Sequence, residues 1–208
     1  MSFITFEGGE GSGKSTQIAL LGKALAAAAI PHVITREPGG SAGAEAVRKL
    51  LVNGEADAWD AETETLLFYA ARLDHVNKLI KPALAEGKIV LCDRFADSTL
   101  VYQGIGKELS ESYVHTLHNL TLGNFMPDVT IILDIDPAIG LKRAAARHSN
   151  ETRFEKMDID FHHRIRAGFS AIAKREPQRC VMVDAGQGQE AVHKRIAQII
   201  SERSGFNV

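Results

Sequence analysis

Short apolar runs alternate along the chain with longer segments whose apolar residues recur at helical spacing. The runs predict five strands, at residues 2–6, 31–35, 88–92, 129–135 and 180–184. The longer segments predict helices, at residues 15–25, 41–52, 61–85, 110–122, 137–147, a stretch that ends near 174, and 189–202. Because strands alternate with helices, we expect an α/β fold, a five-stranded parallel sheet with helices on both faces.

The chain has 208 residues, which is enough for one compact domain with its own core. We therefore expect a single domain over residues 1–208. Polar residues at 148–155 interrupt the two helices around them, and we expect a mobile lid over about residues 143–155.

A glycine-rich segment follows the first predicted strand. It fits the pattern G-x-x-x-x-G-K-[ST] with Gly8, Gly9, Glu10, Gly11, Ser12, Gly13, Lys14 and Ser15. Between a strand and a helix, this pattern predicts a P-loop, in which main-chain N–H groups hold a polyphosphate. Lys14 adds positive charge, Ser15 offers a hydroxyl to Mg²⁺, and Thr16 extends the predicted ATP site. The alternative is a glycine-rich turn without a ligand.

Glu10 is unusual within this loop, because a carboxylate there would repel phosphate. We expect it to face a sugar hydroxyl or a metal-bound water instead. Asp93 ends an apolar strand as a Walker-B acid does, and we expect it to hold Mg²⁺ directly or through water. The alternative for Asp93 is a structural ion pair with Arg94.

Ligands of a parallel sheet gather at the carboxyl ends of its strands. Four arginines belong to the segments expected there: Arg36, Arg48, Arg72 and Arg94. Their planar guanidinium groups suit phosphate oxygens or the edge of a base, although each taken alone could be an ordinary surface residue. Phe68 lies four residues before Arg72, so one helix side would carry both a stacking face and a hydrogen-bonding fork. On sequence alone, Tyr102 and Gln103 are loop residues.

The composition bears on partners and location. The formal net charge is −2, so no global basic field favours nucleic acid. No apolar run approaches the ~20 residues of a membrane helix. Cys92 and Cys180 each lie in an apolar run, which predicts buried thiols in a reducing compartment. We expect a cytoplasmic protein without membrane or nucleic-acid contacts. The eight histidines show no zinc spacing, and we expect them to be solvated.

Several motifs, in order, resemble those of the bacterial thymidylate kinases. They are the P-loop with Glu10, Thr35-Arg36-Glu37-Pro38-Gly39-Gly40, Phe68-Tyr69-Ala70-Ala71-Arg72, Asp93-Arg94-Phe95, Asp97-Ser98-Thr99 and Tyr102-Gln103-Gly104. The portion from Arg143 to Arg153, with Phe161 and Arg164, is similar to that family's lid. The resemblance implies the P-loop NTP hydrolase fold, and transfer of the γ-phosphate of ATP to dTMP, with Mg²⁺, to give dTDP for dTTP synthesis. It also implies a homodimer.

The resemblance also implies roles for single residues. Phe68 would stack on thymine, while Arg72 and Gln103 would read its polar edge. The monophosphate would be held by Arg36, Arg48 and Arg94. The sugar and base would be contacted by Glu10 at the 3′-hydroxyl or the magnesium shell, by Tyr102 near the 2′ position, and by Ser98 and Thr99. With no basic residue at positions 10–12, a lid arginine would supply catalytic charge, either Arg153 or Arg147. On the ATP side we add Arg143.

Two positions depart from the family pattern. Phe95 stands where tyrosine or histidine is common, which leaves the partner of Arg94 open, and Gly9 is smaller than the usual apolar residue. Another P-loop nucleotide or small-metabolite kinase is the nearest alternative. A regulatory GTPase fits less well, because no aspartate follows Asn77-Lys78 to complete N-K-x-D. The near-neutral charge disfavours a nucleic-acid-dependent ATPase.

Overall fold

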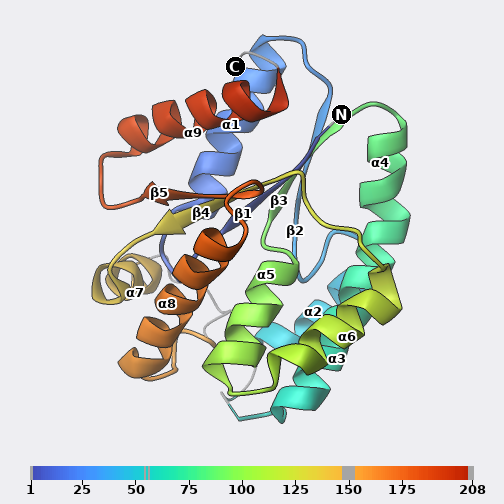
Figure 1. Cartoon of the computed structure of the whole chain (residues 1–208), viewed down its shortest axis with the longest axis vertical. Coiled ribbons are helices and arrows are strands. Elements are labelled where there is room, and N and C mark those ends of the chain that lie inside the picture. The colour runs from blue at the N-terminus through green and yellow to red at the C-terminus, as the bar shows by residue number, and fades with distance from the viewer. Residues whose placement is uncertain (1, 54, 56, 147–152, 206–208) are drawn as a thin grey trace.

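The computed structural model describes residues 2–53, 55, 57–146 and 153–205. At its centre, five parallel strands form a sheet in the order β2-β3-β1-β4-β5 (Figure 1). The strands are β1 (Phe3–Glu7), β2 (His32–Arg36), β3 (Ile89–Asp93), β4 (Val129–Asp134) and β5 (Cys180–Asp184). The three central strands are buried along almost their whole length, as parallel strands covered on both faces should be. The predicted α/β architecture is confirmed.

Helices cover both faces of this sheet. They are α1 (Lys14–Ala27), α2 (Ala42–Val52), α3 (Ala61–His75), α4 (Lys81–Ala85), α5 (Ala96–Thr99), α6 (Glu111–Leu122), α7 (Pro137–Ala145), α8 (Ile159–Arg175) and α9 (Gln189–Ser204). Two π-helical segments, η1 (Val76–Ile80) and η2 (Leu100–Gly106), follow α3 and α5. In Figure 1, α1 and α9 lie on one side of the sheet, and α5, α6 and α8 lie on the other.

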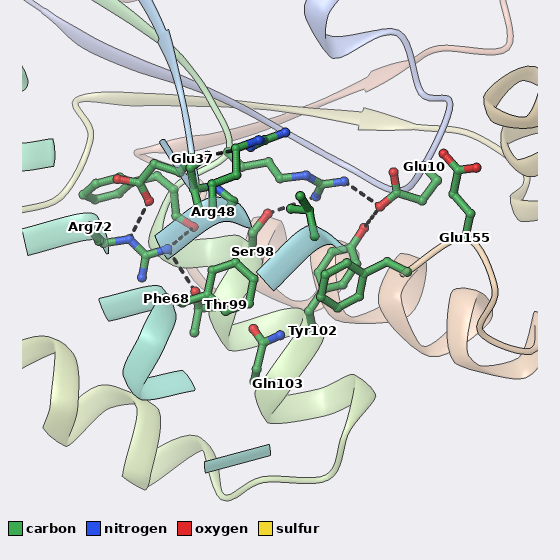
Figure 2. A pocket seen from close by; sticks show the side chains of 15 residues that line it. Glu10, Glu37, Arg48, Phe68, Arg72, Ser98, Thr99, Tyr102, Gln103 and Glu155 are labelled. Carbon is green, nitrogen blue, oxygen red and sulfur yellow. Dashed lines mark hydrogen bonds and ion pairs between the residues drawn. The ribbon is translucent and has the colours of Figure 1, made fainter. Parts of the chain in front are cut away.

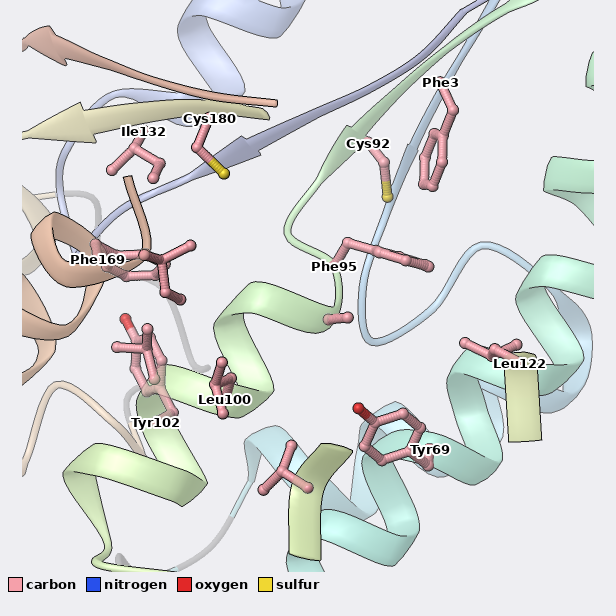
Figure 3. Close-up of a cluster of buried hydrophobic side chains, with 14 of the residues drawn as sticks. Phe3, Tyr69, Cys92, Phe95, Leu100, Tyr102, Leu122, Ile132, Phe169 and Cys180 are labelled. Atoms are coloured by element: carbon pink, nitrogen blue, oxygen red, sulfur yellow. The ribbon is translucent and has the colours of Figure 1, made fainter. Parts of the chain in front are cut away.

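The apolar core is divided by the sheet into two clusters. Ile18 and Leu21 of α1 pack with Ile196 of α9 on one face. On the other face, Phe3 meets Phe95 edge to face, with ring centroids 4.9 Å apart, within the cluster that Figure 3 shows. Burying one such side chain contributes about 1.5–3 kcal/mol, so both clusters hold the strands in place. The carboxyl edge of the sheet is thereby a rigid base for loops.

The strand register brings the predicted site segments to that edge. Phe6 of β1 and Arg36 of β2 both lie beside Asp93 of β3, so the three strands end at one level. The P-loop follows β1, and Arg94 follows β3 directly. The expectation that the P-loop, Arg36, Asp93 and Arg94 meet at one edge is therefore confirmed.

One helical prediction is refined and one is corrected. Residues 61–85 are helical throughout, as predicted, but divide into α3, the π-helical η1 and α4, with Pro82 in the first turn of α4. Residues 96–106, which include Tyr102 and Gln103, are helical and not a loop. The apolar spacing that identifies a buried helix is missing there, because its buried positions carry Asp97, Ser98 and Thr99.

The buried polar residues of α5 are tolerated because each finds a partner. Asp97 accepts two hydrogen bonds from Arg179, at 2.6 and 2.9 Å, and Ser98 donates to Glu7 at 2.5 Å. Pairing removes most of the cost of burying polar groups. The helix α5 is therefore stable in this buried place because Arg179 and Glu7, from distant parts of the chain, pair with its polar side chains.

The predictions for cysteine and histidine have opposite outcomes. Cys92 and Cys180 are buried free thiols, as expected. The expectation of solvated histidines is wrong for His75, His118 and His162, which are all buried. His75 is held by Thr35 and Glu37, at 2.7 and 3.0 Å. No cluster of three or more His, Cys, Asp or Glu residues able to bind a metal occurs among the described residues.

Candidate active site

The P-loop turns between β1 and α1, and two of its glycines are required by geometry. Gly13 caps α1 with φ 95°, in the left-handed region that favours glycine. Gly11 also has positive φ, and a Cβ there would collide with the main-chain carbonyl of Gly140 on α7. The loop is therefore fixed by its backbone, and the N-terminus of α1 opens into it. Such a helix end attracts phosphate.

Lys14 folds over this loop. Its Nζ donates to the carbonyl oxygens of Gly8 and Gly9, at 3.1 and 3.0 Å, and to Ser12 Oγ at 3.3 Å. Burial, together with the positive charge of Arg94, lowers the pKa of Lys14 to about 8, although nearby carboxylates oppose the shift. The side chain is thus mostly charged at neutral pH and lies where a phosphate would replace the carbonyls.

Ser15 and Asp93 offer two hard oxygen atoms beside the loop. Ser15 Oγ donates to Asp93 Oδ2 at 2.7 Å, although the two residues are 78 positions apart. Magnesium prefers such oxygens and usually takes its remaining ligands from water and phosphate. The pair fits a Mg²⁺ ion bound with a nucleotide, and Asp93 does not pair with Arg94.

The puzzle of Glu10 is resolved by its neighbours. Its Oε1 accepts from Arg94 Nη2 at 2.8 Å and from the hydroxyl of Tyr102 at 2.9 Å. Burial opposes ionisation, but the charges of Arg94 and Lys14 dominate and lower the pKa of Glu10 to about 2. The carboxylate is therefore ionised throughout the physiological range and is balanced by two cations.

Arg94 occupies a strained main-chain position with φ 70°. Its guanidinium lies over the ring of Tyr102, 4.9 Å from the centroid. Nη1 also donates to Gly8 O and Ser98 Oγ, both at 3.1 Å. These contacts fix the group at the boundary between the P-loop and α5. They also answer the question left by Phe95, which packs in the core and is not a partner of the Arg94 side chain.

Beneath Arg94, the buried Glu7 holds the chain that follows β3. It accepts from the main-chain N–H of Phe95 at 2.7 Å and from Ser98 Oγ. Burial and the nearby charge of Asp97 raise the pKa of Glu7 to about 7. Through these two hydrogen bonds, Glu7 positions the segment that carries Arg94.

Next to the P-loop lies an open pocket with an empty volume of about 690 Å³, which we call the arginine pocket (Figure 2). It is lined by Glu10, Glu37, Pro38, Arg48, Val52, Phe68, Arg72, Arg94, Phe95, Ser98, Thr99, Tyr102, Gln103, Phe154 and Glu155. Of the ten residues predicted for dTMP, only Arg36 is not part of this lining.

Arg72 lies deep in the arginine pocket, with 2 % of its surface exposed. Its Nε donates to Glu37 at 2.7 Å, and Nη2 donates to Phe95 O and Thr99 Oγ1, at 3.1 and 2.9 Å. Nη1 is buried and has no hydrogen-bond partner within the described part of the chain. Because buried donors are normally paired, Nη1 is a donor available to a ligand.

Aromatic rings form another wall of this pocket. Phe154 lies 6.4 Å from Phe68 and 5.6 Å from Tyr102, measured between ring centroids. Flat apolar faces next to a few placed donors are suited to a planar ring. The predicted pairing of Phe68 with Arg72 in one site is therefore what the fold provides.

A second opening, the P-loop groove, adjoins the arginine pocket. It is lined by residues 10–15, Arg36, Glu37, Arg48, Asp93, Arg94 and Glu155. Both spaces are lined by Glu10, Glu37, Arg48, Arg94 and Glu155. Arg48 and Arg94 are the two cations of this set, so they mark the junction where an anion in the pocket would meet an anion at the P-loop. Arg36 lines the P-loop groove but not the arginine pocket; it pairs with Glu45 at 3.3 Å and is half exposed.

On the other side of the P-loop is a third opening, the outer groove. Gly11, Ser12, Gly13 and Thr16 line it together with Arg143. Arg143 Nη1 donates to the main-chain oxygen of Ala185 at 3.2 Å. Residues predicted for ATP thus line both grooves, and the outer groove leaves room for the rest of the nucleotide.

Comparison with known proteins agrees with this geometry. The family model for thymidylate kinase matches residues 6–196. A thymidylate kinase of Caulobacter vibrioides is 52% identical over 204 residues, which cover 98% of this chain and 98% of that protein. One from Rhodopseudomonas palustris is 53% identical and covers 97% of this chain and 89% of that protein. The crystal structure of thymidylate kinase from Ehrlichia chaffeensis has a TM-score of 0.77 and 38% identity, covering 96% of this chain and 98% of that chain.

The chain belongs to the thymidylate kinase family. Membership confirms the resemblance read from the motifs, and with it the P-loop NTP hydrolase fold. It does not favour the alternative kinases or a GTPase.

The resemblance implies a catalytic lid arginine, either Arg153 or Arg147. Arg153 is 2 % exposed, and its guanidinium bonds to the buried Glu64 and to the main-chain oxygens of Leu51 and Glu55. The structure thus places Arg153 against α2 and α3, and the catalytic role that the resemblance implies for it stays a prediction. Arg147 and residues 148–152 of the expected lid lie outside the described residues.

Sequence reasoning missed four acids and one ring of this thymidylate kinase site. Glu7, Glu37 and Glu64 hold other site residues, while Phe154 and Glu155 line the arginine pocket. For Glu37, its place in the motif with Arg36 was a usable signal. For the others, the sequence carries no local pattern, since their partners lie 39 to 91 residues away or across the pocket.

Proposed function

We propose that the protein is an ATP-dependent kinase that transfers the γ-phosphoryl group of ATP to dTMP, giving dTDP for dTTP synthesis. The observation that carries this proposal is the junction of the two openings. Arg48 and Arg94 line both the arginine pocket and the P-loop groove, so two anions bound in these spaces would meet there. Phosphoryl transfer needs mainly positioning and charge neutralisation, and the junction supplies both.

On the donor side, the P-loop would bind the phosphates of ATP. The main-chain N–H groups at the start of α1 face the loop, and Lys14 would exchange its carbonyl partners for phosphate oxygens. Ser15 and Asp93 would hold Mg²⁺, which when bound neutralises charge on the β- and γ-phosphates. Gly8 to Ser15, Thr16 and Arg143 are the residues that we assign to ATP.

On the acceptor side, the arginine pocket would bind dTMP. Phe68 would stack on the thymine ring, and the free Nη1 of Arg72 would donate to a base oxygen. Arg36, Arg48 and Arg94 would hold the monophosphate where it faces Lys14. Fixed guanidinium groups stabilise developing negative charge without reorganising, which lowers the barrier to transfer.

The other lining residues would fix the sugar and the base. Glu10 would reach the 3′-hydroxyl or the magnesium shell, and its hydrogen bond with Tyr102 would hold that ring beside the sugar's 2′ position. Ser98, Thr99 and Gln103 would complete the base pocket. The approach of Glu10 to Arg94 also keeps this arginine aligned before dTMP arrives.

Broader features belong to the same proposal. The chain would act as one domain over residues 1–208. A lid near residues 143–155 would close over the nucleotides, and Arg153 or Arg147 would serve the reaction only after this closure. The protein would work as a homodimer in the cytoplasm. Within the described ranges, no helix combines the length and the apolar character needed to cross a bilayer.

Acceptor profiling tests the proposal. With ATP and Mg²⁺, the rate with dTMP should exceed the rates with dUMP, dCMP, AMP and GMP by at least about tenfold, which is about 1.4 kcal/mol of discrimination. A coupled assay for ADP, with the nucleotide products separated by chromatography, measures this. Equal rates with all five acceptors would refute the assignment of thymine to the arginine pocket.

A further inference from the structure

A buried cluster of charges adjoins the arginine pocket behind Gln103. Its centre is Glu64 of α3, whose surface is wholly buried. Glu64 Oε2 accepts from Lys107 Nζ at 3.0 Å and contacts Arg153 Nη1, while Oε1 accepts from Gln103 Nε2 at 2.8 Å. The two cations offset the cost of burying the carboxylate. Each of its oxygens therefore has an assigned partner.

This arrangement decides which end of the Gln103 amide faces the pocket. A carboxylate accepts hydrogen bonds and cannot donate them, so it must be met by the NH₂ end of the amide. The carbonyl end, Oε1, then remains for the pocket. Within the part of the chain that the structure describes, no group donates to Oε1, and Gln103 lines the pocket beside Thr99 and Tyr102 (Figure 2).

The orientation matters for the choice of base. Thymine and uracil carry N3–H, a donor, whereas cytosine has a lone pair at N3. A carbonyl oxygen at the wall of the pocket accepts a hydrogen bond from N3–H of thymine or uracil and repels the N3 lone pair of cytosine. A site that offers a fixed partner rejects an analogue that lacks the matching group, because a buried polar atom is left unpaired.

We propose that Glu64 is a positioning residue that fixes the Gln103 amide with Oε1 toward the bound base, and so makes the pocket select pyrimidines with N3–H. This inference rests on the proposed function, since it deepens the choice of acceptor at the same site. Glu64 does not touch the substrate. Its effect passes through one hydrogen bond, and Lys107 and Arg153 support it by holding the other carboxylate oxygen.

The separate partners of the two oxygens yield a sharp test in Glu64→Gln. Lys107 and Arg153 are both donors, so they keep an oxygen of residue 64 as their partner. In the new glutamine side chain that oxygen is the amide carbonyl, and the NH₂ group then occupies the former position of Oε1, next to Gln103. Gln103 must then turn its carbonyl toward residue 64 and its NH₂ toward the pocket. The variant should therefore invert the group that the base meets, with no change in side-chain size.

The readout is the ratio of kcat/KM for dTMP to kcat/KM for 5-methyl-dCMP, which differ at N3 and at position 4 but share the methyl group. We expect this ratio to fall by at least about tenfold in Glu64→Gln, the size of one hydrogen bond. The matched control is Glu62→Gln, an exposed acid on the same helix, in which the ratio should not change. Thermal unfolding of each variant monitors the fold.

Two further variants separate positioning from a structural role. The first is Gln103→Ala, which removes the amide that transmits the effect of Glu64. Adding Glu64→Gln to this variant should leave the ratio of kcat/KM for dTMP to that for 5-methyl-dCMP unchanged. The exchanged pair, Glu64→Gln with Gln103→Glu, again places an acceptor toward the base and should recover most of the wild-type ratio. If the single variant does not fold, the exchanged pair alone decides, since a low ratio in it would contradict the inference.

The outcomes also distinguish this inference from the proposed function. A wild-type protein that does not phosphorylate dTMP would refute both. A wild-type protein that uses dTMP, with an unchanged ratio in folded Glu64→Gln, would refute the positioning role alone. A fall of equal size in the Gln103→Ala background would do the same, because Glu64 would then act by another route.

Discussion

The two halves of the site are built in different ways. The P-loop half consists of eight consecutive residues whose main-chain geometry would do most of the binding that we propose, with Lys14 folded back on the same loop. The arginine pocket is assembled from side chains of α2, α3, α5, η2 and the segments beside them. A local site depends on its own backbone, whereas an assembled site depends on the groups that hold its side chains.

Those supporting groups are buried acids. Glu37 holds Arg72, Glu64 holds Gln103, and Glu7 holds the segment that carries Arg94. All three are at most 5 % exposed. A buried carboxylate whose partner is removed destabilises the fold strongly. Changes in the pocket should therefore affect both binding and stability, while changes in the P-loop should affect catalysis with the fold intact.

The largest effect is expected for Lys14→Ala. In the proposed mechanism this lysine is the main side-chain charge for the transferred phosphate, so kcat should fall by about 10³-fold or more. Its partners are carbonyl oxygens and a hydroxyl that water can replace, so the thermal unfolding midpoint should stay close to that of the wild type. Lys23→Ala, an exposed lysine on α1, is the control with unchanged kcat. Loss of folding in Lys14→Ala would contradict the contrast.

Arg72→Ala should give the opposite pattern. The KM for dTMP should rise by about 100-fold, since a buried charged hydrogen bond is lost, while the KM for ATP should change little. Because Glu37 loses its guanidinium partner, the free energy of unfolding should fall by about 3–5 kcal/mol. Steady-state kinetics and urea unfolding measure both, with Arg195→Ala on the exposed side of α9 as the control. An equal loss of ATP affinity would remove the distinction between the two halves.

Asp93→Asn is expected to have an intermediate effect. The amide oxygen can still accept from Ser15, so the local structure should be retained, but it binds Mg²⁺ more weakly than a carboxylate does. The Mg²⁺ concentration for half-maximal activity should rise about tenfold, which a titration at saturating ATP measures. An unchanged requirement for Mg²⁺ would show that Asp93 serves only the fold.

The smallest effect is a pH dependence confined to the P-loop half. Lys14, with a pKa of about 8, is charged below that pH and loses its proton above it. In the free enzyme, kcat/KM for ATP should therefore fall about fourfold between pH 7 and pH 8.5. Glu10, with a pKa of about 2, stays ionised and adds no limb over this range. Binding of dTMP alone, followed by calorimetry, should not show the alkaline fall.

The same contrast explains what the sequence reveals. The strands, the P-loop and the pairing of Phe68 with Arg72 follow from local patterns, because each depends on neighbours within a few residues. The link from Glu64 to Gln103 spans 39 positions, and that from Asp97 to Arg179 spans 82, so no local pattern carries them.

Two outcomes have the same origin. Tyr102 and Gln103 were wrongly expected in a loop, because buried polar side chains in residues 96–106 hide the helical spacing of apolar residues. For Arg153, the family resemblance implied a role but not a position, and the fold pairs this side chain with a buried acid that the sequence did not single out. In both cases tertiary pairing decides where the residue lies.

The central claim is that a nucleotide gripped by the P-loop and a second one held in the arginine pocket meet at Arg48 and Arg94. A crystal structure with dTMP and a non-hydrolysable ATP analogue tests it most directly. We predict the thymine ring against Phe68, with its phosphate at Arg94 and facing the terminal phosphate bound by Lys14. A dTMP molecule bound elsewhere, or with its phosphate turned away from Lys14, would contradict the account.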